Sequence, residues 1–129
     1  MYVEDIAVDD FIKLFKSGQK LFKNISVEDY TFALENFRLD EVEFQECFIN
    51  INFKNCSFVH AKFIACNLKC VSFDTCNLTG CTISECSIEA MDVRRCTIAG
   101  IIFGTNFYYG IDLSSEKCFS HFEALNNAD

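Results

Sequence analysis

The hydrophobic positions of this chain recur every five residues along most of its length. From Cys56 to Leu113 the pattern runs through twelve units without a slip: CSFVH, AKFIA, CNLKC, VSFDT, CNLTG, CTISE, CSIEA, MDVRR, CTIAG, IIFGT, NFYYG and IDLSS. A period of five fits neither the period of about 3.6 of a helix nor that of about 2 of a strand, so it indicates a solenoid. The first and third residues of each unit should face inward, and the last two should turn a corner. Asn106 is the one first-position residue that breaks the apolar rule.

Inward pairs also occur before this stretch, but their spacing is irregular. The pairs are Ile25 with Val27, Tyr30 with Phe32, Phe37 with Leu39, Val42 with Phe44, Cys47 with Ile49, and Ile51 with Phe53. Two residues too many separate Phe32 from Phe37, and one too few separates Ile49 from Ile51. Because a one-residue slip turns a strand inside out, we expect a bulged or tightened corner at each place.

The repeat resembles the pentapeptide-repeat family, whose consensus is a small residue, Asn or Asp, Leu or Phe, and two variable positions. CNLKC and CNLTG match this consensus best, and the resemblance covers roughly residues 25 to 113. It implies an all-β fold, a right-handed quadrilateral β-helix in which four units form one coil, with about four to five coils here. This chain departs from the family by placing Cys where Ala is commonest.

Both ends of the chain predict helices that cap the solenoid. Residues 1–24 are predicted as an N-terminal cap, 25–113 as the β-helix, and 114–129 as a C-terminal tail. Within the cap, residues 8 to 17 are amphipathic, Asp9 or Asp10 can cap the first turn, and Gly18 suits a left-handed C-terminal cap. Ser114 or Ser115 can start the tail helix. The tail either covers the last coil or forms a dimer contact, and both are compatible.

Composition and charge limit the partners and the cellular location that we expect for the protein. A length of 129 residues with 50% apolar residues fits one folded domain. The net charge of −8 argues against nucleic acid or an anionic membrane as partner, because both select basic surfaces. The acidic N-terminal stretch and the lack of a long apolar run predict a cytoplasmic protein, and the resemblance implies a bacterial one. The nine cysteines follow the repeat, so we expect ladders of free thiols instead of disulfides or metal ligands.

Catalytic motifs are missing from the sequence, and we expect no catalytic, cofactor-binding or metal-binding residue. His60 ends its unit and should be an exposed corner. We therefore interpret the chain as a non-catalytic protein-binding module of unknown partner. The resemblance also suggests an alternative, a DNA-mimicking modulator of gyrase that gives quinolone resistance or toxin immunity. A β-helix enzyme is a second alternative, but no insertion is long enough to build a cleft.

Two groups of residues are candidate binding surfaces. The first is an acidic set that should face solvent around the irregular first coil and could attract a basic protein. Its members are Glu35, Asp40, Glu41, Glu43 and Glu46. The second is an apolar set near the C-terminus for self-association or for packing of the tail, in a possible homodimer. Its members are Phe107, Tyr109, Phe119 and Phe122, and Phe107 and Tyr109 should lie on the same face as Phe48.

Overall fold

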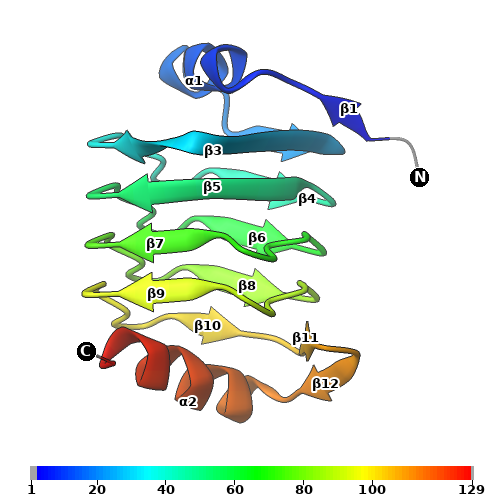
Figure 1. Cartoon of the computed structure of the whole chain (residues 1–129), viewed down its shortest axis with the longest axis vertical. Coiled ribbons are helices and arrows are strands. Elements are labelled where there is room, and N and C mark those ends of the chain that lie inside the picture. Colours follow the sequence, from blue (N-terminus) through cyan, green and yellow to red (C-terminus); the bar gives the residue numbers. More distant parts are fainter. Residues whose placement is uncertain (1–2, 129) are drawn as a thin grey trace.

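The computed structural model describes residues 3–128, except for the side chains of residues 30–32, and shows a β-solenoid with a helix at each end (Figure 1). Two opposite sides are parallel five-stranded sheets. One sheet contains β1 (Glu4–Asp5), β3 (Ile25–Glu35), β5 (Phe48–Lys54), β7 (Ser72–Asp74) and β9 (Asp92–Arg94). The other contains β2 (Leu21–Lys23), β4 (Glu43–Gln45), β6 (Lys62–Ile64), β8 (Thr82–Ser84) and β10 (Ile102–Phe103). The predicted all-β solenoid is confirmed.

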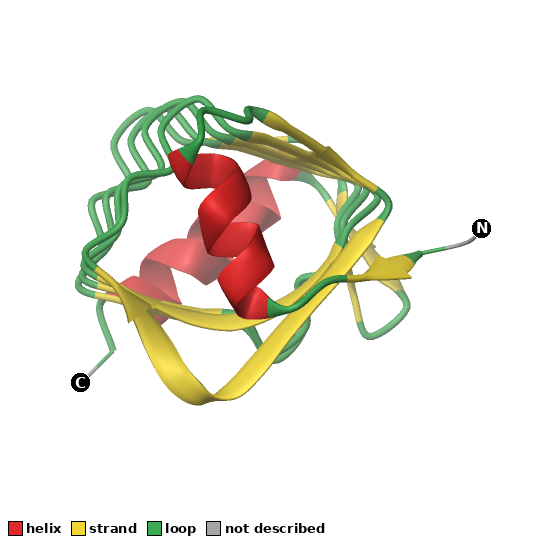
Figure 2. Cartoon of the chain, turned by 90° about the horizontal axis from the view of Figure 1, so that it is seen from above, coloured by secondary structure: helices red, strands yellow, loops and turns green. Residues whose placement is uncertain are grey.

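Single bridges form the two remaining sides of each coil. One side carries Arg38, Ser57, Asn77 and Thr97 in register, and the other carries Phe48, Asn67, Ser87 and Phe107. Registered partners in the regular part lie one coil, or 20 residues, apart, as in the bond from Cys66 N–H to Cys86 Sγ. The coils therefore stack with matching positions above one another, which gives the four-sided outline in Figure 2.

The last residue of most units turns the corner in a left-handed conformation. Besides Gly80 and Gly100, this set includes Asn55, His60, Ala65, Cys70, Thr75, Glu85, Ala90 and Arg95. A left-handed backbone costs a residue with a Cβ about 1 kcal/mol. Corner amides offset that cost by bonding to the next coil, as from His60 N–H to Thr79 O at 3.0 Å. The predicted division of each unit into an extended segment and a corner is confirmed.

Aromatic rings stack from coil to coil in the core. Phe44 lies parallel to Phe63 with centroids 5.0 Å apart, and Phe53 lies parallel to Phe73 at 5.6 Å. Phe58 contacts both Phe53 and Phe73 edge to face, at 4.9 and 5.3 Å. First and third positions from Cys56 to Cys96 are buried, as the repeat predicts, and Ile98 in the same unit as Cys96 is half-buried.

The first coil is irregular, although the extra residues lie earlier than predicted. Glu28 registers with Asn50 and Ala33 with Asn52, so residues 29–32 of β3 stand opposite Ile51 alone. Leu34 is buried and registers with Phe53, the inward position that the sequence assigned to Phe32. The side chains of Tyr30 and Phe32 lie outside the described part. Figure 2 shows β3 bowing outward, and β5 passes through Ile51 as one strand, which is the tightened corner expected there.

Helix α1 (Val8–Lys16) covers the first coil and buries Phe11 and Phe15. Gly18 ends it as predicted, with φ of 101°, a bond from its N–H to Phe15 O and one from Gln19 N–H to Leu14 O, both at 3.1 Å. The prediction that Asp9 or Asp10 caps the start is wrong, because the N-cap is Ala7 and no side chain bonds there. Strand β2 joins the sheet through β4, so the solenoid starts inside the range predicted as the cap.

The C-terminal end reverses direction instead of completing another coil. Strands β11 (Asn106–Tyr108) and β12 (Ile111–Leu113) form an antiparallel hairpin. Tyr109 and Gly110 between them have φ of 50° and 77°, which is a type I′ turn. Helix α2 (Ser115–Asn126) then packs against β9 and β10, with Ser114 as the N-cap, so the predicted C-terminal helix is confirmed. No helix within residues 3–128 is long and apolar enough to cross a membrane.

Candidate binding surfaces

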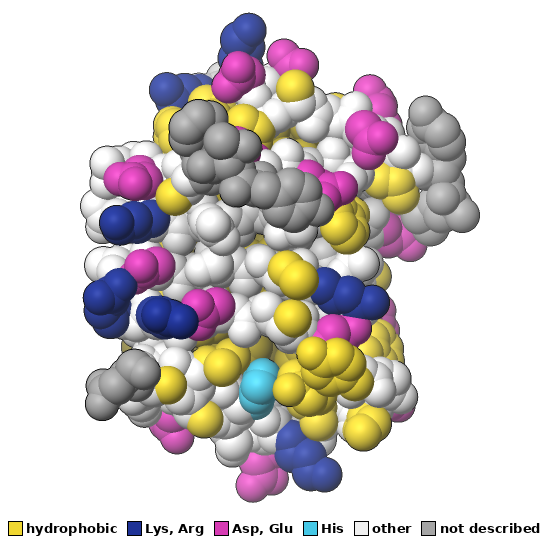
Figure 3. Space-filling model, in the orientation of Figure 1, with side chains coloured by type: hydrophobic (Ala, Val, Ile, Leu, Met, Phe, Trp, Pro, Cys, Tyr) yellow, Lys and Arg dark blue, Asp and Glu magenta, His cyan; other side chains and the backbone are white. Residues whose placement is uncertain are grey.

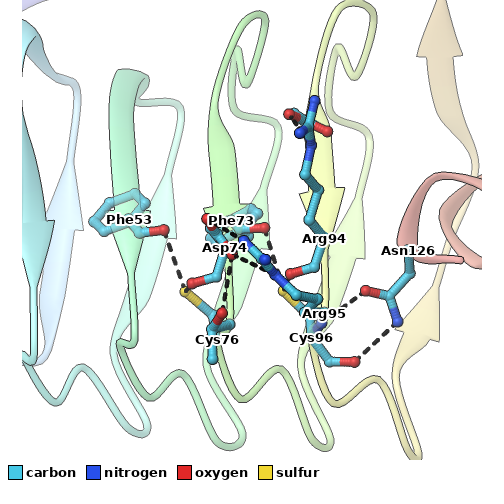
Figure 4. A network of polar contacts seen from close by, with 10 residues as sticks. Phe53, Phe73, Asp74, Cys76, Arg94, Arg95, Cys96 and Asn126 are labelled. Carbon is cyan, nitrogen blue, oxygen red and sulfur yellow. Dashed lines mark hydrogen bonds and ion pairs between the residues drawn. The ribbon is translucent and has the colours of Figure 1, made fainter. Parts of the chain in front are cut away.

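Two ladders of buried thiols run along the inside of the solenoid. One contains Cys47, Cys66 and Cys86, and the other contains Cys56, Cys76 and Cys96, all of them free. Each thiol donates to a backbone carbonyl of its own coil and to a backbone carbonyl of the preceding coil. Cys76 Sγ, for example, lies 3.5 Å from both Asp74 O and Phe53 O (Figure 4). The thiols therefore bind backbone carbonyls as well as fill space.

Each ladder ends in an asparagine that sequence reasoning missed. Asn106 is buried, donates from Nδ2 to Ile83 O at 3.0 Å and Gly104 O at 3.2 Å, and accepts from Cys86 N–H at 2.9 Å. Asn126 of α2 accepts from Cys96 N–H at 2.7 Å and donates to Cys96 O at 2.9 Å (Figure 4). Both amides satisfy backbone groups that a further coil would otherwise bind. The polar first-position residue at 106 was the sequence signal for one of them.

The thiol environments argue against a reactive site. Burial raises the pKa of the Cys81 thiol to about 12. The hydrogen bond between Cys56 and Cys76 lowers the pKa of Cys56 to about 7 and raises that of Cys76, but Cys56 is only 2% exposed. Among residues 3–128, no group of three His, Cys, Asp or Glu side chains could hold a metal ion.

The acidic set rings the first coil without forming one patch. Glu35 ends β3 in one sheet, Glu43 lies on β4 in the opposite sheet, and Asp40, Glu41 and Glu46 lie at or next to corners. Glu35, Glu41 and Glu46 are exposed as predicted, whereas Asp40 and Glu43 are half-buried. The structure thus brings Asp40 and Glu41 together and separates Glu35 and Glu43.

Most of these acids face a base or donor of the second coil. Glu35 registers with Lys54, and Glu43 registers with Lys62. The Asp40 carboxylate accepts from Ser57 Oγ at 2.5 Å and Val59 N–H at 2.8 Å. Asp40 consequently braces the second coil, and the negative field of the set is partly neutralised by its neighbours.

The apolar set marks an exposed surface at the C-terminal end. Phe107 and Tyr109 are 36% and 65% exposed, and Phe107 shares its side with Phe48 through the bridge register, as predicted. Ile111 is 62% exposed, because the hairpin reversal turns out a position that the repeat predicted to be inward. We call Phe107, Tyr109 and Ile111 the C-terminal apolar surface. Hydrophobic side chains gather over this hairpin in Figure 3.

Phe119 and Phe122 belong to the capping helix. Phe122 is fully buried, and its ring centroid lies 4.7 Å from that of Phe103. It therefore packs the tail against the solenoid, as one of its two expected roles required, and is not available to a partner. Phe119 is 39% exposed and contacts Phe103 from the side at 6.4 Å. The helix thus uses one ring as an anchor and leaves the other at the rim.

Glu89 fixes the turn of the hairpin. Its carboxylate accepts from Tyr109 N–H at 3.2 Å and pairs with Lys69 Nζ at 3.1 Å. Burial raises the pKa of Glu89, but the bonds from Lys69 and Tyr109 N–H outweigh it, and the pKa lies below its usual value. The Tyr109 ring also packs on that of Tyr108, with centroids 4.8 Å apart. The aromatic residues at this end are therefore held in defined positions.

These features define a repeat protein of the parallel β-solenoid class, built from five-residue units. The family model for pentapeptide repeats matches residues 47–84, in eight copies. Residues 47–84 therefore consist of pentapeptide repeats, and the resemblance that the sequence pattern indicated is confirmed over this part of the chain. A search of curated proteins finds no match.

Proposed function

We propose that this protein is a non-catalytic protein-binding module that holds a protein partner at the C-terminal apolar surface. The observation that carries the proposal is the contrast between this end and the regular coils. Outward positions on the bridged sides of those coils are small and polar, at Ser57, Asn67, Asn77, Ser87 and Thr97. The C-terminal hairpin instead exposes three large apolar side chains, Phe107 on one face, Ile111 on the other and Tyr109 at the turn between the strands. Exposed apolar clusters of this kind are typical of interaction sites.

Affinity capture from bacterial cytosol tests this proposal. Phe107→Ser/Ile111→Ser should lose the partner that the wild-type chain retains, because it removes two of the three apolar side chains. Leu21→Ser is the matched control, since Leu21 is an exposed apolar residue at the opposite end of the solenoid. Equal recovery of the partner by all three proteins would contradict the proposal. Sedimentation of the same variants tests whether the partner is a second copy.

The acidic set around the first coil, which we call the acidic ring, is a second candidate contact. It would bind a basic surface of the same partner. Glu41 and Glu46 are its exposed corner members, and replacing both by Gln removes charge without disturbing the Asp40 brace. We expect the variant to associate more slowly and with a weaker dependence on salt. An unchanged association rate would remove the ring from the binding surface.

A DNA-mimicking modulator of gyrase has less support from the charge distribution. A mimic of a duplex needs acids along its length, whereas the regular coils carry Asp74 and Asp92 in ion pairs with Arg95 and Arg94. About five coils at about 4.8 Å also give a rod of only about 24 Å. Supercoiling by gyrase with and without quinolone tests this alternative, and unchanged supercoiling would exclude it.

A further inference from the structure

The outer edge of β12 has backbone groups that point away from its partner strand β11. In a hairpin closed by a two-residue turn, the pair next to the turn exchanges hydrogen bonds, and the following pair does not. Here the closing pair is Tyr108 with Ile111, and the following pair is Phe107 with Asp112. Phe107 points its groups the other way, because its N–H binds Cys86 O at 2.8 Å and its C=O accepts from Ile88 N–H at 2.9 Å. By the same alternation, Asp112 directs its N–H and C=O to the open edge.

This edge extends one side of the solenoid. The bridge register runs from Phe48 through Asn67 and Ser87 to Phe107, and β12 adds one antiparallel strand after it. Within residues 3–128, β12 pairs with β11 alone. An additional strand would therefore continue a sheet-like side that the protein already has, and strand addition to an exposed edge is a general mode of peptide recognition.

Charge decides which strand fits. The Asp112 side chain is exposed, and no hydrogen bond or ion pair engages it among the described residues. A second copy that paired its β12 antiparallel around Asp112 would place two carboxylates opposite each other, and each chain carries a net charge of −8. Like charges directly opposite one another destabilise strand pairs. A foreign strand with a Lys or Arg at this position would instead gain an ion pair.

We propose that the edge of β12 binds an extended segment of a partner protein that carries a basic residue opposite Asp112 and apolar residues on either side of it. Because side chains alternate along a strand, the basic residue lies on the face of Phe107 and Asp112, and its two neighbours lie on the face of Ile111. Those neighbours would cover Ile111, which is 62% exposed. This inference rests on the proposed function, and it adds the conformation and sequence pattern of the bound segment.

A phage-displayed library of random dodecapeptides, selected on the immobilised full chain, tests the pattern. We expect the selected peptides to share an apolar-basic-apolar core. Asp112→Lys should bind a selected peptide at least tenfold more weakly and should select an acidic residue at the central position. Glu123→Lys is the matched control, because it makes the same charge change on an exposed position of α2 and should leave binding within twofold. Loss of no more than twofold with Asp112→Lys would overturn the proposal.

Amide hydrogen exchange tests the backbone pairing directly. A selected peptide should slow exchange of the Asp112 amide at least tenfold, whereas contact between side chains alone would leave it unchanged. An unchanged Asp112 amide, a selected pattern with helical spacing, or failure to select any peptide would overturn strand docking. The proposed function would stand in these cases if cytosolic capture still depended on Phe107 and Ile111, so the two failures are distinguishable.

Discussion

At the scale of single residues, Asn106 shows how a side chain can replace the missing coil. Asn106→Leu should lower the free energy of unfolding by about 3 kcal/mol, because the buried Cys86 N–H and the carbonyls of Ile83 and Gly104 lose their partner. Asn106→Cys should cost about 1 kcal/mol, since Cys86 already makes the equivalent two donations one coil earlier. Urea unfolding measures both variants, and equal losses would contradict the role of the amide.

Core packing depends on the rings more than on the thiols. Phe73→Ala should lower the free energy of unfolding by about 3 to 5 kcal/mol, because it removes a ring that packs against Phe53 and Phe58. Cys76→Ala should cost about 1 kcal/mol, since it removes a small side chain and a weak donor. The comparison again uses urea unfolding. Equal losses from the two variants would mean that Cys76 is held by more than packing and these bonds.

At the scale of secondary-structure elements, the docking of α2 should depend on pH through His121. His121 is half-buried against Tyr108, with ring centroids 5.0 Å apart, and burial lowers the pKa of the imidazole below 6.5. At pH values near the pKa of His121, the native state therefore binds fewer protons than the unfolded state. The contribution of His121 to stability is fully present above about pH 6.5 and is lost as pH falls through the folded pKa.

We expect the free energy of unfolding to decrease as pH falls from 7.5 to 5, and His121→Gln to flatten this decrease. Chemical unfolding across the pH range measures the slope. His60→Gln is the matched histidine control, because His60 lies on an exposed corner away from α2, and it should leave the slope in place. A slope that His121→Gln does not change would assign the pH dependence to other groups.

The elements differ in how far the sequence predicts them. The five-residue period predicts the regular coils because each unit carries its own inward pair, and Gly18 predicts the end of α1 because its signal is local. The hairpin is not predictable from the period. Gly110 occupies the same unit position as the left-handed corner residues Gly80 and Gly100, and only the additional left-handed conformation of Tyr109 turns a corner into a reversal.

The candidate surfaces were predictable to a similar extent. The exposure of Phe107 and Tyr109 follows from the alternation of the repeat, whereas that of Ile111 depends on the reversal. The sequence also could not show that the extra residues come before Leu34 and not after Phe32. Both residues are apolar, so either could occupy the inward position. Asn126 pairs with Cys96 across 30 residues, a contact for which the chain has no periodic signal.

At the scale of the whole molecule, charge alternates between coils along one sheet. Glu35 registers with Lys54, Lys54 with Asp74, and Asp74 with Arg94. Arg95 adds a two-pronged contact to Asp74, and its hydrogen bonds hold the pKa of that carboxyl below the usual value. Opposite charges at registered positions favour the native stacking over a slipped one. The acidic first coil is therefore matched by a more basic second coil. The net charge of −8 does not reveal this alternation of positive and negative side chains between coils.

This matching predicts that the position of a charge matters more than the total. Lys54→Glu/Lys62→Glu should lower the free energy of unfolding by about 1 to 3 kcal/mol, because each new carboxylate registers with Glu35, Asp74 or Glu43. Lys23→Glu/Lys117→Glu changes the net charge by the same amount, but Lys23 registers with Gln45 and Lys117 lies on α2, so the cost should be smaller. Urea unfolding at about 0.1 M and about 1 M salt measures both. The difference between the variants should shrink at high salt, where screening shortens the reach of charges to about 3 Å. Equal losses at low salt would show that only the total charge counts, and the alternating register would then have no part in aligning the coils.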